Sequence, residues 1–218
     1  MTRAAGLLLA AALLAGACAS PLERPALAKT RFVLDPGRPP DAAAAAPDGA
    51  GAAGAGSLLV ARVRVSPLFD HKAFVYRTGA ETFESDPYHE WFAQPGDVLR
   101  EATLGWLEEA GLFAGVERRS VSGADWLLET MVDRLYTDRR DPDAPAAVLA
   151  GRFRLLDLRG ARPRRAVELR FDEREPAGDG APQALVDAWG RALGRALETL
   201  APELRAAVTS RARADGAR

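Results

Sequence analysis

The sequence predicts an α/β fold: a single domain in which a mixed, mostly antiparallel sheet is covered on one face by two helices. Two observations predict this class. Alternating apolar and polar residues mark several strands, and apolar stripes at helical spacing mark two helices. The chain of 218 residues, less an N-terminal leader, suits one hydrophobic core. The predicted order is β, β, ββ, α, β, ββ, α over residues 31–208.

The leader, residues 1–17, has a basic start and a short apolar core, which predict a signal peptide. Small residues precede Cys18, the only cysteine, and this context predicts a lipidated N-terminus anchored in a membrane. The alternative is an ordinary signal peptide, since Leu14 stands four positions before Cys18 instead of three. A lone thiol is unusual in an oxidising compartment, which favours lipidation.

Residues 18–30 predict a tether that contains proline, and residues 31–34 predict a short edge strand. Residues 38–57 are mostly Ala, Gly, Pro and Asp, which predicts a flexible loop with too little apolar surface to pack. Residues 49–54 match G-x-G-x-x-G. No strand precedes them and no helix follows, so a chance match is favoured over a nucleotide site.

The first half of the domain predicts a strand over residues 59–65, with one apolar face, and a hairpin from residues 73–77 and 81–84. A helix is predicted from an N-cap within residues 95–97 to Gly111. Its apolar stripe consists of Leu99, Ala102, Trp106 and Ala110.

The second half predicts a central strand over residues 126–136, because both of its faces are partly apolar. Residues 148–158 and 167–171 predict a second hairpin. A last helix is predicted over residues 184–200, which Pro202 interrupts or restarts. Residues 209–218 predict a disordered tail.

The composition argues against several kinds of partner and chemistry. The net charge of −1 gives no basic bias for nucleic acid, and no apolar run after Cys18 is long enough to span a bilayer. No G-x-x-x-x-G-K-[ST] or G-x-S-x-G motif occurs. His71 and His89 each adjoin a carboxylate, but neighbours on an extended chain point to opposite faces. We expect no catalytic residue, no metal and no cofactor besides the lipid on Cys18.

Three segments carry a resemblance to a known family. They are Phe74-Val75-Tyr76-Arg77, Glu90-Trp91-Phe92-Ala93-Gln94-Pro95, and the helix end Gly111-Leu112-Phe113-Ala114-Gly115-Val116. With residues 31–35 and 125–129, this pattern resembles the ABC-type transport auxiliary lipoproteins, a PqiC/YmbA-like family. The resemblance covers most of the chain after Cys18. The long Ala/Gly insertion at residues 41–56 departs from the family pattern.

This resemblance implies an accessory of an MCE-type ABC transport system that moves lipids or other hydrophobic molecules between inner and outer membranes. Its partners would be an MCE-domain protein and an ABC permease with its ATPase. Ala19 stands where an aspartate would signal inner-membrane retention, so we expect the periplasmic face of the outer membrane. A homo-oligomer would suit a cap around a transport tube. The alternatives are a lipoprotein that assists assembly of an outer-membrane protein or secretin, and a tethered hydrolase, which the missing motifs disfavour.

Two groups of residues admit both a binding and a structural account. Tyr76, Arg77 and Trp91 either line a partner-binding surface or pack the domain, and packing is favoured. A run of arginines in the second hairpin either meets an anionic surface or forms a solvated face balanced by Asp157 and Glu168, and the solvated face is favoured. This run comprises Arg152, Arg154, Arg159, Arg162, Arg164 and Arg165, and Arg62 and Arg64 belong to the same argument.

Overall fold

A computed structural model describes residues 28–40, 55–118 and 123–216 of the chain. These residues form a mixed sheet of nine strands and two helices, in agreement with the predicted class. The predicted signal peptide, the lipidation site Cys18 and the glycine motif at residues 49–54 lie outside the described residues.

The sheet is organised around β7 (Trp126–Asp138), the central strand that the sequence predicts. On one side, β7 pairs antiparallel with β8 (Ala146–Asp157), which pairs antiparallel with β9 (Arg164–Pro176). On the other side, three short strands follow one another along β7, all parallel to it: β2 (Ser57–Val60), β3 (Arg64–Val65) and β4 (Ala73–Arg77). On β7, the long ladder with β8 is thus antiparallel, and the short ladders with β2, β3 and β4 are parallel.

Three further strands extend the short side of the sheet. β6 (Gly115–Glu117) pairs parallel with β2, and β5 (Phe83–Trp91) pairs antiparallel with β4, as the predicted hairpin requires. β1 (Thr30–Phe32) pairs parallel with β5 at the edge of the sheet, where a short first strand was expected.

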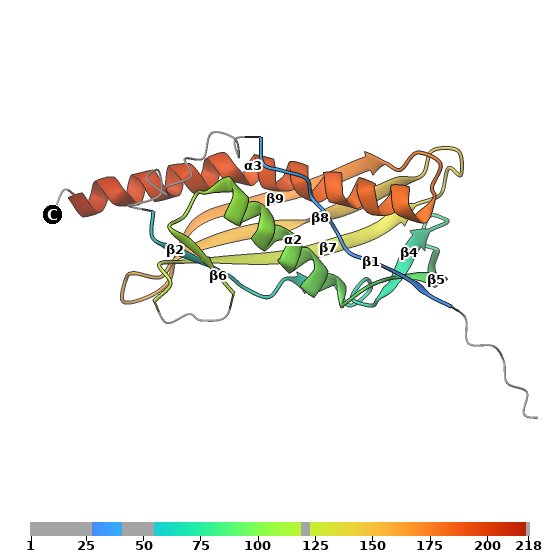
Figure 1. The fold of residues 1–218 in the computed structure, drawn as a ribbon, viewed down its shortest axis with the longest axis horizontal. Coiled ribbons are helices and arrows are strands. Elements are labelled where there is room, and N and C mark those ends of the chain that lie inside the picture. Colours follow the sequence, from blue (N-terminus) through green and yellow to red (C-terminus); the bar gives the residue numbers. More distant parts are fainter. Residues whose placement is uncertain (1–27, 41–54, 119–122, 217–218) are drawn as a thin grey trace, which may run out of the picture.

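Both helices, α2 (Pro95–Ala110) and α3 (Pro182–Gly216), cover the same face of the sheet, as predicted (Figure 1). The single core lies between them and the inward side chains of β7, β8 and β9. Neither helix combines the length and the apolar character that a membrane span needs. The opposite face of the sheet has no helix over it, and Arg152, Arg154 and Arg170 are at least partly exposed there. Toward the other end of β7 and β8, residues 135–138 and 146–151 are buried on both faces.

The structure corrects several predicted boundaries. The strand over residues 59–65 is broken between Val60 and Arg64, although Ala61 and Ser66 still donate backbone hydrogen bonds to β7. β5 runs well beyond the predicted residues 81–84, and β6 was not predicted. Gln94, with Pro95 after it, is the N-cap of α2 in place of a residue of the 95–97 segment. Gly111 ends α2 in the left-handed conformation, as expected.

The last helix is much longer than predicted. It continues through Pro202, and residues 209–216 of the predicted disordered tail are helical. A proline inside a helix removes one hydrogen bond, but Leu200 and Leu204 are fully buried on either side of it, and this packing outweighs the loss. Farther along, the Arg211 guanidinium lies 3.4 Å from Asp157 of β8 and 3.3 Å from Asp215, which ties the end of the helix to the sheet.

Candidate functional site

The uncovered face of the sheet carries a row of arginines. In the strand register, Arg64 of β3 pairs with Met131 of β7, Met131 with Arg152 of β8, and Arg152 with Arg170 of β9. The row therefore crosses four neighbouring strands, and its three guanidinium groups project from one face. We call Arg64, Arg152 and Arg170 the guanidinium row.

The local sequence explains why these arginines share a face. On β8, Phe153 and Leu155 are fully buried under the helices, so the alternating Arg152 and Arg154 point to the other side. Phe171 on β9 is buried in the same way, which turns Arg170 outward. The alternation of buried and exposed residues along each strand determines the face to which an arginine side chain points. The pairing register between strands then places these arginines side by side.

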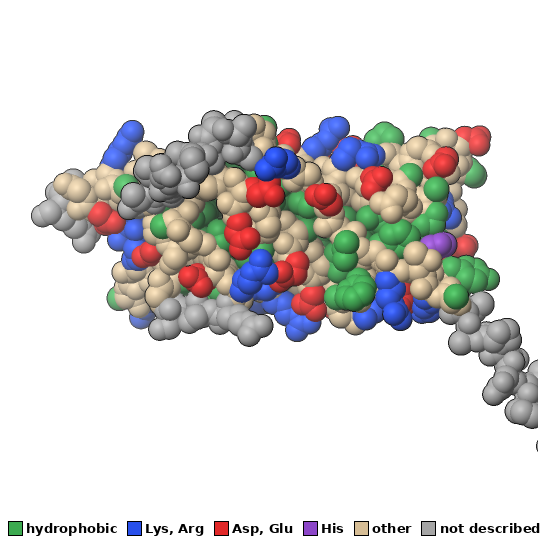
Figure 2. Space-filling model, in the orientation of Figure 1, with side chains coloured by type: hydrophobic (Ala, Val, Ile, Leu, Met, Phe, Trp, Pro, Cys, Tyr) green, Lys and Arg blue, Asp and Glu red, His purple; other side chains and the backbone are tan. Residues whose placement is uncertain are grey.

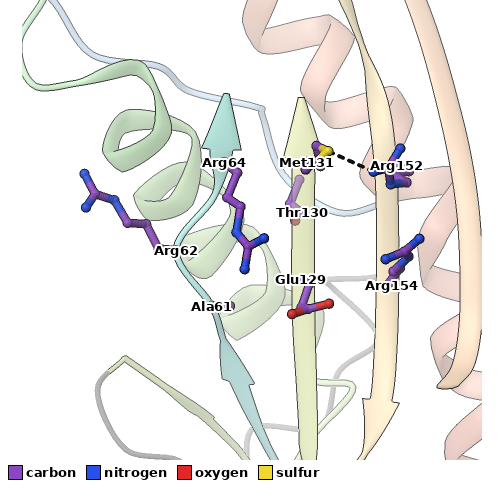
Figure 3. Close-up of a pocket in the computed structure, with 8 residues that line it drawn as sticks. All are labelled: Ala61, Arg62, Arg64, Glu129, Thr130, Met131, Arg152 and Arg154. Carbon is purple, nitrogen blue, oxygen red and sulfur yellow. Dashed lines mark hydrogen bonds between the residues drawn. The ribbon is translucent and has the colours of Figure 1, made fainter. Parts of the chain in front are cut away.

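Members of the guanidinium row lack acidic partners. Among the described residues, none of the three has a carboxylate within 4 Å, although Arg152 Nη2 lies 2.9 Å from the sulfur of Met131. Figure 3 shows Arg64, Arg152 and Arg154 around a shallow depression of about 50 Å³, with Glu129 and Met131 of β7 between them. Glu129 also makes no ion pair within 4 Å in the described chain, so the unpaired charge on this face is net positive.

The neighbouring row is different, because its arginine, Arg154, has an acidic partner. Glu168 of β9 lies 3.4 Å from Arg154 and also accepts a hydrogen bond from Arg165. Partial burial raises the pKa of Glu168, but the charges of Arg154 and Arg165 outweigh it and hold this pKa below its usual value. Arg154 thus has a carboxylate partner that the members of the guanidinium row lack.

The predicted arginine run is divided by the sheet. Arg152, Arg154 and Arg165 reach the uncovered face, whereas Arg159 stacks over Trp126 at 4.8 Å and lies 3.4 Å from Asp157. Arg62 turns toward α2, where its Nε lies 3.8 Å from Asp97. The predicted balancing role of Asp157 and Glu168 is therefore seen for part of the run. Arg170 was not singled out in the sequence, because it lies outside the arginine-rich turn.

Tyr76, which the sequence marks as a partner-binding candidate, is buried. Its hydroxyl donates a 2.5 Å hydrogen bond to Asp86, and the Arg139 guanidinium stacks 3.8 Å from its ring centre. Burial, together with this hydrogen bond, raises the pKa of the Tyr76 phenol above its usual range. These contacts give Tyr76 a packing role between β4 and β5.

Trp91, the second candidate, lies in an aromatic cluster in the core. Its side chain is 3% exposed, with its ring centre 4.8 Å from that of Phe74 and 5.0 Å from that of Trp189 on α3. Arg77, the third candidate, binds the β4–β5 turn by donating to the Gly79 and Ala80 carbonyls, and it lies over the Phe83 ring. The burial of Tyr76 and Trp91 favours the structural account of these residues.

His89 has a partner that the sequence argument missed. Its Nδ1 lies 2.8 Å from Asp86 Oδ2, three residues earlier in the chain. The adjacent Glu90 instead binds Lys29 and Arg31 at 2.8 and 3.0 Å, which fastens β1 to β5. Burial alone would raise the pKa of Asp86, but hydrogen bonds from Tyr76, Tyr88 and His89 hold it below its usual value. In the described part of the chain, no three His, Cys, Asp or Glu side chains gather as a metal site.

An apolar groove of about 330 Å³ lies between the segment after β1 and helix α2. Val33 and Phe92 are exposed there, at 67% and 62%, and Asp97 and Glu101 also contribute to its wall. The helix-covered face shows acidic and basic side chains interspersed (Figure 2). The guanidinium row, by contrast, brings three arginines together on the other face.

Comparison with known proteins agrees with this fold. A crystal structure of a Xanthomonas campestris protein assigned to the DUF330 family matches with a TM-score of 0.65 and 19% identity, covering 85% of this chain and 98% of that one. A crystal structure of an uncharacterized protein matches with a TM-score of 0.60 and 15% identity, covering 82% and 98%. At these identities, the likeness concerns the fold alone. No curated protein sequence matches the chain.

The sequence itself matches a family over most of its length. The model of the ABC-type transport auxiliary lipoprotein component family aligns with residues 38–201, from the segment after β1 to the middle of α3. This span includes the hairpin, the first helix and the central strands on which the resemblance was based. The chain therefore belongs to the ABC-type transport auxiliary lipoprotein component family.

Proposed function

We propose that the protein is a membrane-anchored periplasmic accessory of an MCE-type ABC transport system, which moves lipids or other hydrophobic molecules between the inner and outer membranes. It acts by docking to an MCE-domain protein and to the ABC permease with its ATPase. The observation that carries this proposal is the family match over residues 38–201, because that family is defined as an auxiliary component of ABC-type transport.

The proposed mechanism is positional. A lipid on Cys18 holds the protein at the periplasmic face of the outer membrane, and the chain from Cys18 to Thr30 can extend at most about 40 Å. The folded domain therefore stays close to the membrane while its surfaces meet partner chains. A homo-oligomer of this domain would form a cap around a transport tube. No catalytic residue, metal or cofactor enters the proposal.

The test is a crosslinking pull-down from membranes with the wild-type protein and the Cys18→Ser variant side by side. Recovery of an MCE-domain protein and its permease, weakened by Cys18→Ser, supports both the transport role and the anchor. Recovery of only a β-barrel protein or a secretin contradicts the proposal and favours an assembly factor. If the wild-type protein and Cys18→Ser recovered the MCE-domain protein and the permease equally, the transport role would be supported. The lipid anchor on Cys18 would then not be needed for docking.

Crosslinker position can then map the docking surface. Photo-crosslinking residues placed at Phe92, beside the apolar groove, and at Glu198, on the outer side of α3, sample two exposed surfaces. A partner that crosslinks from one position and not from the other identifies the contact face. A second readout is the envelope of a deletion strain: leakiness to hydrophobic compounds with normal outer-membrane protein levels supports transport over assembly.

A further inference from the structure

We propose that the uncovered face of the sheet binds the phosphate groups of an anionic membrane surface through the guanidinium row, Arg64, Arg152 and Arg170. The proposal goes beyond docking to transport partners, and it does not depend on the lipid at Cys18. It concerns a binding surface built into the fold by β3, β7, β8 and β9.

The first argument is that the free protein is destabilised by repulsion between arginines of the row. Arg152 and Arg170 are direct cross-strand neighbours, and like charges in such positions destabilise a sheet. A surface that served only solubility would pair them with carboxylates, as the next row does with Glu168. Binding of an anion would remove this repulsion and supply the missing partners.

The second argument is the chemistry of the side chains. A guanidinium presents a planar fork of donors that matches the oxygen atoms of a phosphate, and it gives up its hydration more readily than an ammonium group does. The three members project side by side from neighbouring strands. They can therefore meet several phosphates of one surface at the same time.

The third argument concerns the shape of the face and selects a membrane over an acidic protein. Tight protein interfaces rely on side chains that fill pockets, but the depression beside Arg64 and Arg152 holds only about 50 Å³. Between the charges lies the partly exposed Met131, and the arginine stems add further apolar surface. A shallow face with charged tips and apolar stems suits lipid head groups.

The experiment measures binding to vesicles. The full chain carrying Cys18→Ser, which removes the predicted acyl anchor, is sedimented with vesicles of phosphatidylcholine alone or mixed with phosphatidylglycerol, at low salt. We compare it with the triple variant R64Q/R152Q/R170Q. The matched control is R38Q/R118Q/R213Q, which removes the same charge from exposed arginines away from the row.

We expect binding only to the vesicles that contain phosphatidylglycerol. Each arginine near an anionic surface contributes about fivefold in affinity, so the row variant should bind about 100-fold more weakly, while the control changes by less than about threefold. Thermal melting followed by circular dichroism verifies that both variants fold. The variant R64K/R152K/R170K, which keeps the charge, should recover most of the binding.

Several results would overturn the proposal. Equal binding to both kinds of vesicle, or equal losses in the row and control variants, would show that the row has no special part. Titration with inorganic phosphate alone, followed by calorimetry, tests for a free-phosphate site; saturable binding that the row variant loses, without vesicle binding, would replace the membrane with a small anion. Binding to polyglutamate without vesicle binding would assign the face to an acidic protein.

Discussion

Arg152 and Arg170 lie directly opposite each other on β8 and β9, on the face of the sheet that no helix covers. Neither has a carboxylate within 4 Å among the described residues. Like charges in such positions repel each other. The pair should therefore be a point at which removing a charged side chain stabilises the free protein.

Arg170→Gln should raise the free energy of unfolding by about 0.2 to 1 kcal/mol at low salt, because it removes this repulsion. High salt should abolish the gain, since salt screens exposed charges. Urea denaturation at the two salt concentrations measures both effects. The control is Arg165→Gln, which removes a partner of Glu168 and should not stabilise the protein. A loss of stability in Arg170→Gln at low salt would contradict the prediction.

Trp91 and Phe92 are consecutive residues with opposite environments. Trp91→Ala should lower the free energy of unfolding by about 3 to 5 kcal/mol, because it leaves a cavity between Phe74 and Trp189. Phe92→Ala should change it by less than about 0.5 kcal/mol, since the Phe92 ring is 62% exposed. Urea denaturation of both variants measures the two changes in the free energy of unfolding. Similar losses from the two substitutions would show that Trp91 is not part of the core described above.

Gly190 marks a close approach between α3 and the segment after β1. A Cβ atom at this position would lie 2.1 Å from the Asp35 carbonyl oxygen, so Gly190→Ala forces the backbone apart. We expect a loss of about 1 to 3 kcal/mol in the free energy of unfolding.

The matched control for Gly190 is Gly105→Ala, on α2. A Cβ atom at Gly105 meets nothing within 4 Å, so alanine there should add up to about 1 kcal/mol through its higher helix propensity. Thermal melting should show a lower melting temperature for Gly190→Ala and an equal or higher one for Gly105→Ala. Stabilisation by both alanines would mean that the 33–38 segment does not lie against α3 in solution.

Strands with one clearly buried face could be predicted from the sequence, and elements held by distant contacts could not. The alternation over residues 126–132, 151–157 and 167–171 is regular enough to place β7, β8 and β9. β3 has only two residues, and its existence depends on the neighbouring β7. α3 passes through Pro202 because leucines on both sides are buried by the sheet, which a rule about proline alone does not include.

The candidate surface shows a similar limit. The sequence indicates many arginines near the second hairpin, but alternation alone does not give the register that aligns Arg64 of β3 with Arg152 and Arg170. The same register separates Arg159 from them, because it lies beyond the end of β8 and pairs with Asp157. The partner of His89 does not follow from its sequence neighbours, because Asp86 reaches it from three residues away.

Asp138 gives a prediction about acid stability. Hydrogen bonds from Arg140 and Arg174 hold the pKa of this buried carboxyl far below its usual range, although burial opposes them. A carboxyl whose pKa is lower in the folded state stabilises the protein above its unfolded-state pKa, and this contribution is lost as the pH falls. The stability that Asp138 supplies should therefore be complete at neutral pH and decline below about pH 4.

Asp138→Asn should lower the free energy of unfolding by about 1 to 3 kcal/mol at neutral pH, because both arginines lose their charged acceptor. The variant should also lose less stability than the wild type between neutral pH and about pH 3, since the titrating group is gone. Urea denaturation across this pH range measures both differences. Asp143→Asn, in the exposed β7–β8 turn, is the control and should follow the wild type at every pH. If Asp138→Asn and the wild type lost the same free energy of unfolding between neutral pH and about pH 3, the prediction would be contradicted. The ion pairs of Asp138 with Arg140 and Arg174 would then not stabilise the folded state.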